Sequence, residues 1–169
     1  MSINYCTVDQ VNIVSAVQAD EPLYVSVYAD DEPPYVAVIA DPDAPSYLNV
    51  FSRDLTVAFD GSSNWWFGYA LWLNINGSPY ALTYAAPNQQ ITLTPYVQGS
   101  PTPRQIWGMR HVTPLGGVNC ILIPTYDYTE RVVMDLKNSG TSIGTPILSW
   151  HLDAGVAVNQ YWHYQEVLP

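Results

Sequence analysis

The chain has 169 residues, enough for one domain with a substantial core and too few to require two. Aromatic residues make up 13% of it and 14 prolines are spread through it, which excludes a disordered chain and disfavours a helical one. A formal net charge of −10 repels phosphate backbones, so a nucleic-acid partner is disfavoured.

The start of the chain bears on where the protein works. Residues 1–20 contain neither a basic segment nor an apolar core, so we see no secretory signal. No apolar run approaches the roughly 20 residues that a membrane helix needs. We therefore expect a cytoplasmic protein that does not insert into membranes. Cys6 and Cys120 are the only cysteines, and without a leader we expect free thiols rather than a disulfide.

The first third of the chain contains short runs with the apolar-polar alternation or the β-branched content of strands. These runs cover residues 12–17, 23–28, 35–39, 48–51 and 55–59. Acidic, proline-rich clusters at 30–34 and 41–45 separate them, because proline cannot donate to a strand ladder. The carboxylates in these clusters could hold a metal, but the spacing of a calcium loop is missing, so we expect solvated turns and no metal or other cofactor.

The strongest hairpin signal is Asn76-Gly77, between expected strands at 71–75 and 80–84. Both central residues of a type I′ turn need positive φ, which asparagine and glycine tolerate. Asn76-Gly77-Ser78 is also a glycosylation sequon, but Pro79 follows it and no leader is present, so the turn is favoured.

The rest of the chain also contains short runs that predict strands. Further strands are expected at 91–95, 105–111, 119–124 and 132–135, then before His151 and at the end of the chain. No window of 11 or more residues has a helical period. About a dozen short strands predict an all-β sandwich or barrel.

An amide-x-Trp triplet occurs three times, beginning at Asn64, Gln105 and Gln160. When the last two copies are aligned without a gap, Leu93 pairs with Leu148 and Trp107 with Trp162. Internal repeats indicate structural units that cannot cover their own apolar face and must close around a shared core. We expect both tryptophans in that core.

The last of these triplets resembles the ricin-B-type (R-type) lectin repeat, which ends in Gln-x-Trp. The resemblance implies a single-domain β-trefoil of three units, approximately 1–70, 71–113 and 114–169. It implies a lectin for galactose or N-acetylgalactosamine, with glycans of glycoproteins or glycolipids as partners. Since the chain starts at Met-Ser, it looks similar to the leaderless lectins of fungal fruiting bodies, whose implied role is defence.

In the third unit the resemblance assigns the sugar site to five residues. Asp135 would accept hydroxyl protons, Trp150 would be the aromatic platform, and Asn159 would donate and accept hydrogen bonds. Gln160 would brace the aspartate, and His151 lies beside the platform and could line the rim or supply the aromatic face. A sugar ring needs such a set, because its C–H face stacks on an indole and its hydroxyls need a charged acceptor and an amide.

The other two units are expected to have lost the site. In the second, Thr83 or a neighbour takes the aspartate position and Arg104 stands where Asn159 stands in the third. A single weak site per chain would gain avidity from pairing of two chains, so we expect a homodimer.

No catalytic motif competes with this hypothesis, and we expect no enzyme activity. The alternative is a β-trefoil protease inhibitor, which would present an exposed loop. The proline-rich segment 99–104 or the acidic loops near Asp31 and Asp41 could serve, since prolines reduce the ordering cost of binding.

Overall fold

The computed structural model describes residues 10–28, 33, 35–40, 48–56, 65–112, 119–124, 131–152 and 157–166. Its strands are β1 (Gln10–Ser15), β2 (Tyr24–Tyr28), β3 (Tyr35–Ala40), β4 (Leu48–Thr56), β5 (Trp65–Ile75), β6 (Ser78–Thr83), β7 (Thr92–Pro95), β8 (Trp107–Val112), β9 (Asn119–Pro124), β10 (Val132–Leu136), β11 (Ile147–His151) and β12 (Trp162–Glu166). The short 3-10 turns η1 (Pro103–Gln105), η3 (Lys137–Ser139) and η4 (Val158–Gln160) are the only helical segments in these residues. The all-β class is confirmed.

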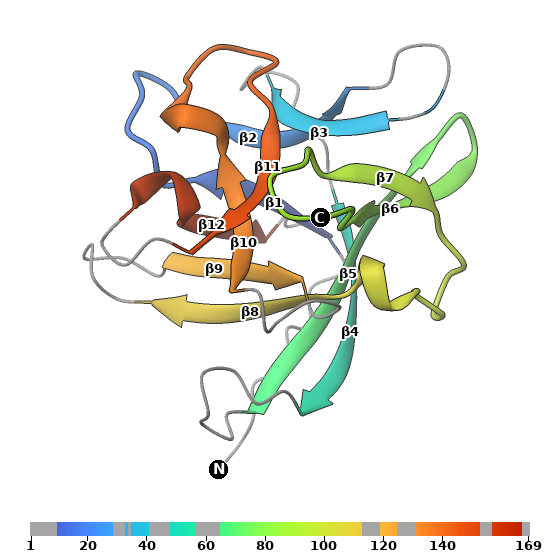
Figure 1. Ribbon diagram of the computed structural model, residues 1–169. Helices are drawn as coiled ribbons and strands as arrows, with labels where there is room; N and C mark the ends of the chain where they lie inside the picture. The colour runs from blue at the N-terminus through green and yellow to red at the C-terminus, as the bar shows by residue number, and fades with distance from the viewer. Residues whose placement is uncertain are drawn as a thin grey trace.

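Six strands form a closed ring. β1 pairs with β4, β4 with β5, β5 with β8, β8 with β9, β9 with β12, and β12 returns to β1 (Figure 1). The closing pair is antiparallel, from Val11↔Glu166 to Ser15↔Trp162. Closure removes the unpaired edges that an open sheet would expose.

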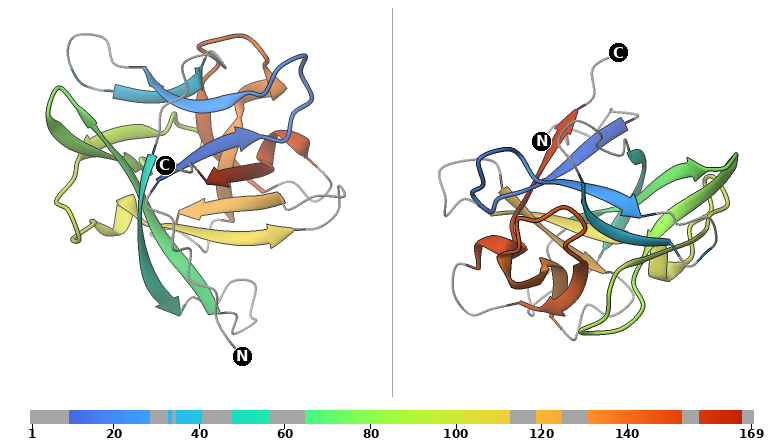
Figure 2. Two further views of the ribbon diagram at one scale, coloured as in Figure 1. Left: turned by 180° about the vertical axis from the view of Figure 1, so that it is seen from behind. Right: turned by 90° about the horizontal axis from the view of Figure 1, so that it is seen from above.

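The three hairpins β2–β3, β6–β7 and β10–β11 lie together beside the ring and meet one another in equivalent ways (Figure 2). Equivalent residue pairs join each hairpin to the next: Val36↔Thr92, Gln90↔Leu148 and Val38↔Pro146, and β3 and β7 have a second pair at Tyr35↔Leu93. The residues beside these contacts, Ala37, Ile91 and Ile147, are fully buried. The arrangement has pseudo-threefold symmetry and is the β-trefoil architecture that the resemblance implies.

Both predicted core tryptophans are confirmed. Trp107 and Trp162 are completely buried, in a cluster with Ile13, Leu48 and Leu71. The indole N–H of Trp107 donates to the Leu82 carbonyl and that of Trp162 to the Met134 carbonyl, each at 3.0 Å. Each indole therefore packs its own unit and satisfies a buried carbonyl.

The strand boundaries correct the sequence prediction in three places. Residues 48–51 and 55–59 were expected as two strands, but β4 is continuous because it pairs without a break along β5, from Asn49↔Trp72 to Thr56↔Trp65. The β5 strand likewise begins well before residue 71, at Trp65. The expected strand at 105–111 starts instead with the turn η1.

The predicted hairpin at Asn76-Gly77 is confirmed. Asn76 has φ 50° and Gly77 φ 81°, and Ile75 pairs with Ser78 across the turn. Several other predictions fall outside the described residues, among them the first triplet residue Asn64, Cys6 and the acidic cluster 41–45. No helix among the described residues is long and apolar enough to cross a membrane.

Candidate functional site

The β10–β11 hairpin brings Asp135 and Trp150 to the same face. Asp135 pairs with Leu148 and Val133 with Trp150. Because side chains alternate along a strand, this face carries Asp135 and Trp150, and the opposite face carries the core residues Met134 and Ile147. The carboxylate and the indole are thus diagonal neighbours on adjacent strands.

The Asp135 carboxylate is held by two amides from η4. Its Oδ2 atom accepts hydrogen bonds from Asn159 Nδ2 and Gln160 Nε2, each at 2.9 Å. Asp135 is 4% exposed, and a carboxylate this buried needs such charge-assisted bonds to offset its desolvation. The η4 turn therefore places three of the predicted site residues in contact.

Each of these amides uses both of its hydrogens inside the protein. Asn159 Nδ2 also donates to the Leu136 carbonyl at 3.2 Å, and Gln160 Nε2 to the His151 carbonyl at 2.8 Å. A backbone carbonyl can only accept, which determines the orientation of both amides. Gln160 is 1% exposed and braces Asp135. The expectation that Asn159 would also donate to a ligand is corrected, because only its Oδ1 acceptor remains for that purpose.

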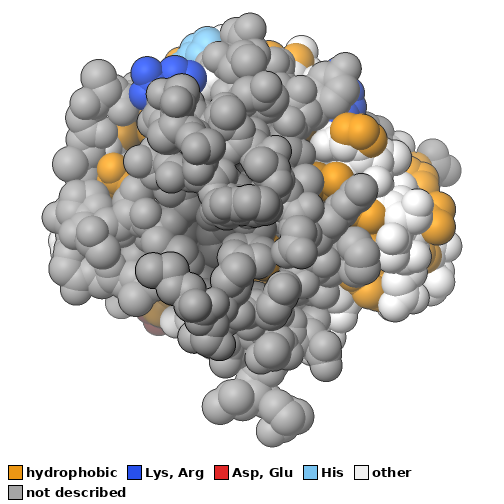
Figure 3. Space-filling view, turned by 90° about the horizontal axis from the view of Figure 1, so that it is seen from below, with side chains coloured by type: hydrophobic (Ala, Val, Ile, Leu, Met, Phe, Trp, Pro, Cys, Tyr) orange, Lys and Arg blue, Asp and Glu red, His pale blue; other side chains and the backbone are white. Residues whose placement is uncertain are grey.

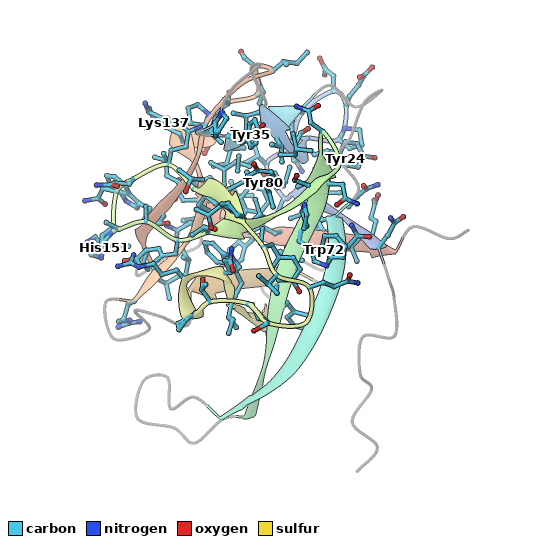
Figure 4. All side chains as sticks on the ribbon, turned by 90° about the vertical axis from the view of Figure 1, so that its right-hand side faces the viewer. Tyr24, Tyr35, Trp72, Tyr80, Lys137 and His151 are labelled. Carbon is cyan, nitrogen blue, oxygen red and sulfur yellow. The ribbon has the colours of Figure 1, made fainter. Side chains whose placement is uncertain are left out.

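Trp150 is 40% exposed, so a large part of its indole faces solvent. His151 is exposed as well, but strand alternation directs its side chain to the opposite face of the hairpin. Figure 4 shows Lys137 and His151 along the same edge of the molecule, at the two ends of the hairpin, away from Tyr24 and Trp72. The aromatic surface beside Asp135 is therefore that of Trp150, and His151 contributes its backbone carbonyl to the bracing of Gln160.

Two described cations lie next to this hairpin. Exposed cations stand at its two ends, Arg131 just before β10 and Lys137 just after it. On the face seen in Figure 3, basic side chains lie beside a histidine at the upper edge. No group of three or more metal-binding side chains occurs in the described ranges. The site thus combines acceptor oxygens with an apolar ring surface, which suits a ligand that donates hydrogen bonds and has a C–H face.

The second unit has the same framework without the carboxylate or the indole. Thr83 follows Leu82 as Asp135 follows Met134, next to the carbonyl that the buried tryptophan binds. The Thr83 and Thr94 hydroxyls lie 2.8 Å apart, and Gln105 Nε2 donates to Thr94 Oγ1 at 3.0 Å. Two hydroxyls bonded to each other therefore take the place of Asp135 and Trp150.

The geometry also corrects the ungapped alignment. Gln105 Nε2 donates to the Pro95 carbonyl as Gln160 Nε2 does to that of His151, so Pro95 corresponds to His151. The residue equivalent to Leu148 is accordingly Thr92 and not Leu93, a shift of one position. The shift arises because the third unit has one residue fewer between Trp150 and Gln160 than the second unit has between Thr94 and Gln105.

Arg104 fills the place of Asn159 and points inward. Its Nη1 atom donates to the Tyr84 carbonyl at 3.3 Å and to the Ala85 carbonyl, and its guanidinium lies 5.8 Å from the Tyr84 ring centre. The preceding loop is tied down, since Gly99 N donates to Tyr96 Oη and Thr102 N to Gln105 Oε1. An inhibitor loop for a trypsin-like protease would need to present Arg104 to solvent, and the segment 99–104 does not do so.

The first unit has Ser26 at the aspartate position. Ser26 pairs with Val38 across its hairpin, as Thr83 pairs with Thr92 and Asp135 with Leu148. In each unit the second residue of the pair also pairs with a residue of the neighbouring hairpin. Sequence reasoning did not find Ser26, because a serine in a strand has no distinguishing signal. Asp135 is the only carboxylate at the three equivalent positions.

No protein-family model matches the sequence, and no curated protein matches it. The structure is similar to the designed threefold-symmetric protein ThreeFoil, with a TM-score of 0.65 and 15% identity over 94% of this chain and 99% of that one. It is similar to part of a mosquitocidal holotoxin, with a TM-score of 0.71 and 14% identity over 99% of this chain and 18% of the toxin. It is also similar to the C-half of an earthworm R-type lectin in complex with GalNAc, with a TM-score of 0.50 and 14% identity over 94% of this chain and 99% of that one.

These likenesses show the fold, a β-trefoil, and the lectin neighbour belongs to the R-type class that the C-terminal residues resemble. At such low identity they leave ligand and biological role to the residues of the site. None of these three structures tests the predicted similarity to the lectins of fungal fruiting bodies.

Proposed function

We propose that the protein is a carbohydrate-binding β-trefoil, a lectin with one site for a galactose or N-acetylgalactosamine ring in its third unit. The observation that carries the proposal is the convergence of Asn159 and Gln160 on Asp135 Oδ2, beside a Trp150 indole that is 40% exposed. Bracing of this kind holds a charged acceptor still, and the ordering cost of binding is then already met by the fold.

The chemistry of the ring fits this arrangement. Galactose-type sugars have adjacent hydroxyls that can donate to Asp135 and to Asn159 Oδ1, and a C–H face that can stack on Trp150. The solved complex of the earthworm lectin with GalNAc supports this ligand class by analogy of fold.

Calorimetric titration with methyl galactoside and N-acetylgalactosamine, preceded by a broad glycan array, tests the proposal. Asp135→Asn keeps the shape but removes the charge, so we expect it to weaken binding by roughly 10- to 100-fold, the worth of a charge-assisted hydrogen bond. Trp150→Ala should abolish measurable binding, and because Trp150 is 40% exposed, it should lower the unfolding temperature less than truncation of a fully buried tryptophan would. The matched control is Thr83→Ser, at the equivalent position of the second unit, which should bind like the unaltered protein.

A protein that recognises no glycan on the array would refute the proposal. So would undiminished binding by Asp135→Asn with an unchanged unfolding temperature. We also propose that the protein does not react with its ligand, so sugar recovered after binding should be chemically unchanged. Thin-layer analysis of the recovered ligand would check this.

A single site has a consequence for assembly. One weak site per chain binds a cell surface usefully only if chains pair, so we propose a homodimer as the working form. Sedimentation equilibrium measures this directly, and a monomer at all concentrations that still agglutinates glycan-coated beads would contradict it.

A further inference from the structure

The edge of β11 that faces away from β10 is covered by a segment of the second unit. Ile91 N donates to the Ile147 carbonyl and Ser149 N to the Gln89 carbonyl, each at 2.9 Å, and Asn88 N donates to the Ser149 carbonyl at 2.6 Å. In Figure 1 this green connection between β6 and β7 runs beside β11. The contacts reach the residue directly before Trp150, so the second unit forms one border of the site.

The bordering segment is a preformed turn. Gln89 N donates to the Ala86 carbonyl at 3.3 Å, which closes a four-residue turn with Pro87 second and Asn88 third. Asn88 has φ 63°, and turns of this kind favour proline in the second place and asparagine or glycine in the third. Its conformation is therefore set before any ligand arrives.

The turn presents two amides to solvent. Asn88 and Gln89 are exposed, and neither side chain makes a hydrogen bond within the part of the chain that the structure describes. Each amide offers two donor hydrogens and one acceptor oxygen. Backbone hydrogen bonds tie both residues to Ser149, which directly precedes Trp150.

Amide hydrogens are what the site residues Asn159 and Gln160 cannot offer a ligand. Both hydrogens of Asn159 and both of Gln160 are used internally, so Asp135 and Asn159 Oδ1 offer only acceptors. A sugar hydroxyl has one hydrogen to donate and two lone pairs to be met. A glycan longer than one ring carries further hydroxyls whose lone pairs an adjacent amide donor would satisfy.

We propose that Asn88 and Gln89 form a second sugar subsite, so that the ligand class is an oligosaccharide of at least two rings. The first ring lies on Trp150 beside Asp135, and the second lies over the turn from the neighbouring unit. This inference rests on the proposed function, because the turn matters only if the first ring binds where proposed.

The same subsite does not occur at the equivalent place after the third unit. Gly144 stands there, with φ 83° like the positive φ of Asn88, but it has no side chain. The contact Val38↔Pro146 is the counterpart of Gln90↔Leu148, which fixes the correspondence. The amides therefore border the one hairpin that has the carboxylate and the indole.

Titration of a matched ligand series tests the subsite. Methyl galactoside is compared with lactose, melibiose and galactosyl-β1,3-N-acetylgalactosamine, in the unaltered protein and in the double variant Asn88→Gly, Gln89→Ala. Glycine keeps the positive φ that alanine would strain, so the turn is preserved. Gln98→Ala, an exposed amide on the loop after β7, is the control.

We expect at least one disaccharide to bind about three- to tenfold tighter than methyl galactoside, as one or two net hydrogen bonds allow. The double variant should lose this advantage while its affinity for methyl galactoside stays within about twofold, and Gln98→Ala should lose neither. If methyl galactoside binds and no disaccharide binds better, or the double variant keeps the advantage, the subsite is overturned and the proposed function stands. If neither ligand binds, both are overturned.

Discussion

Replacing Gln160 by alanine would remove the two hydrogen bonds that link Asp135 Oδ2 to the His151 carbonyl. The bond to the carboxylate is worth about 1.5–3 kcal/mol and the bond to the carbonyl about 0.5–1.5 kcal/mol, so we expect a loss of roughly 2–4 kcal/mol in the free energy of unfolding. Gln160 is 1% exposed, so water cannot replace these bonds without a rearrangement. Equilibrium unfolding in urea, followed by tryptophan fluorescence, measures the loss.

A double-mutant cycle separates the charged part of this effect. In the Asp135→Asn background the acceptor is neutral, so Gln160→Ala should cost about 1 kcal/mol less than in the unaltered protein. Gln105→Ala is the matched control, because its Nε2 bonds are to the neutral groups of Thr94 and Pro95. A loss below about 1 kcal/mol for Gln160→Ala, or the same loss in both backgrounds, would show that the amide does not brace a charged carboxylate.

Three further outcomes are expected. Trp162→Phe leaves the buried Met134 carbonyl without its indole donor and opens space in the core, so unfolding should become about 2–4 kcal/mol easier; an unchanged melting temperature would contradict this. Gly77→Ala meets no atom within 4 Å, so its cost in urea unfolding should be the backbone strain alone, about 1–2 kcal/mol, and a loss well above that would mean an unseen contact. Arg104→Met loses the bond to the Tyr84 carbonyl, so urea unfolding should show a loss of about 1–2 kcal/mol in the free energy of unfolding. Neither the unaltered protein nor the variant should inhibit trypsin at equimolar concentration. Inhibition that is present in the unaltered protein and absent in the variant would favour the inhibitor alternative.

Much of the fold could be predicted because its signals are local. Alternating residues mark strands, and Asn76-Gly77 marks a hairpin, since both depend on the backbone preferences of neighbouring residues. The repeated triplet also predicted that Trp107 and Trp162 lie in the core. The break expected between residues 51 and 55 was wrong, because pairing along β5 holds β4 extended through polar residues.

The candidate site was only partly accessible to sequence reasoning. Its residues, including the carboxylate of Asp135, were predicted from the resemblance to the R-type lectin repeat. The sequence could not show that both amides have no hydrogens to offer a ligand, because their partners include backbone carbonyls at Leu136 and His151. Nor could it show that Arg104 turns inward, since a guanidinium in a proline-rich loop looks equally suited to solvent.

By itself, the sequence determined the β class and the principal hairpin turn, since both follow from side chains a few residues apart, and the repeated triplet determined the tryptophans on which two units pack. Tertiary structure alone decided the rest. It joined β1 to β12, placed Ser26, Thr83 and Asp135 at equivalent positions, and set the turn at Asn88 against the strand of Trp150. These contacts join residues that are distant in the chain, and their energies depend on closure of the whole ring and not on any local pattern.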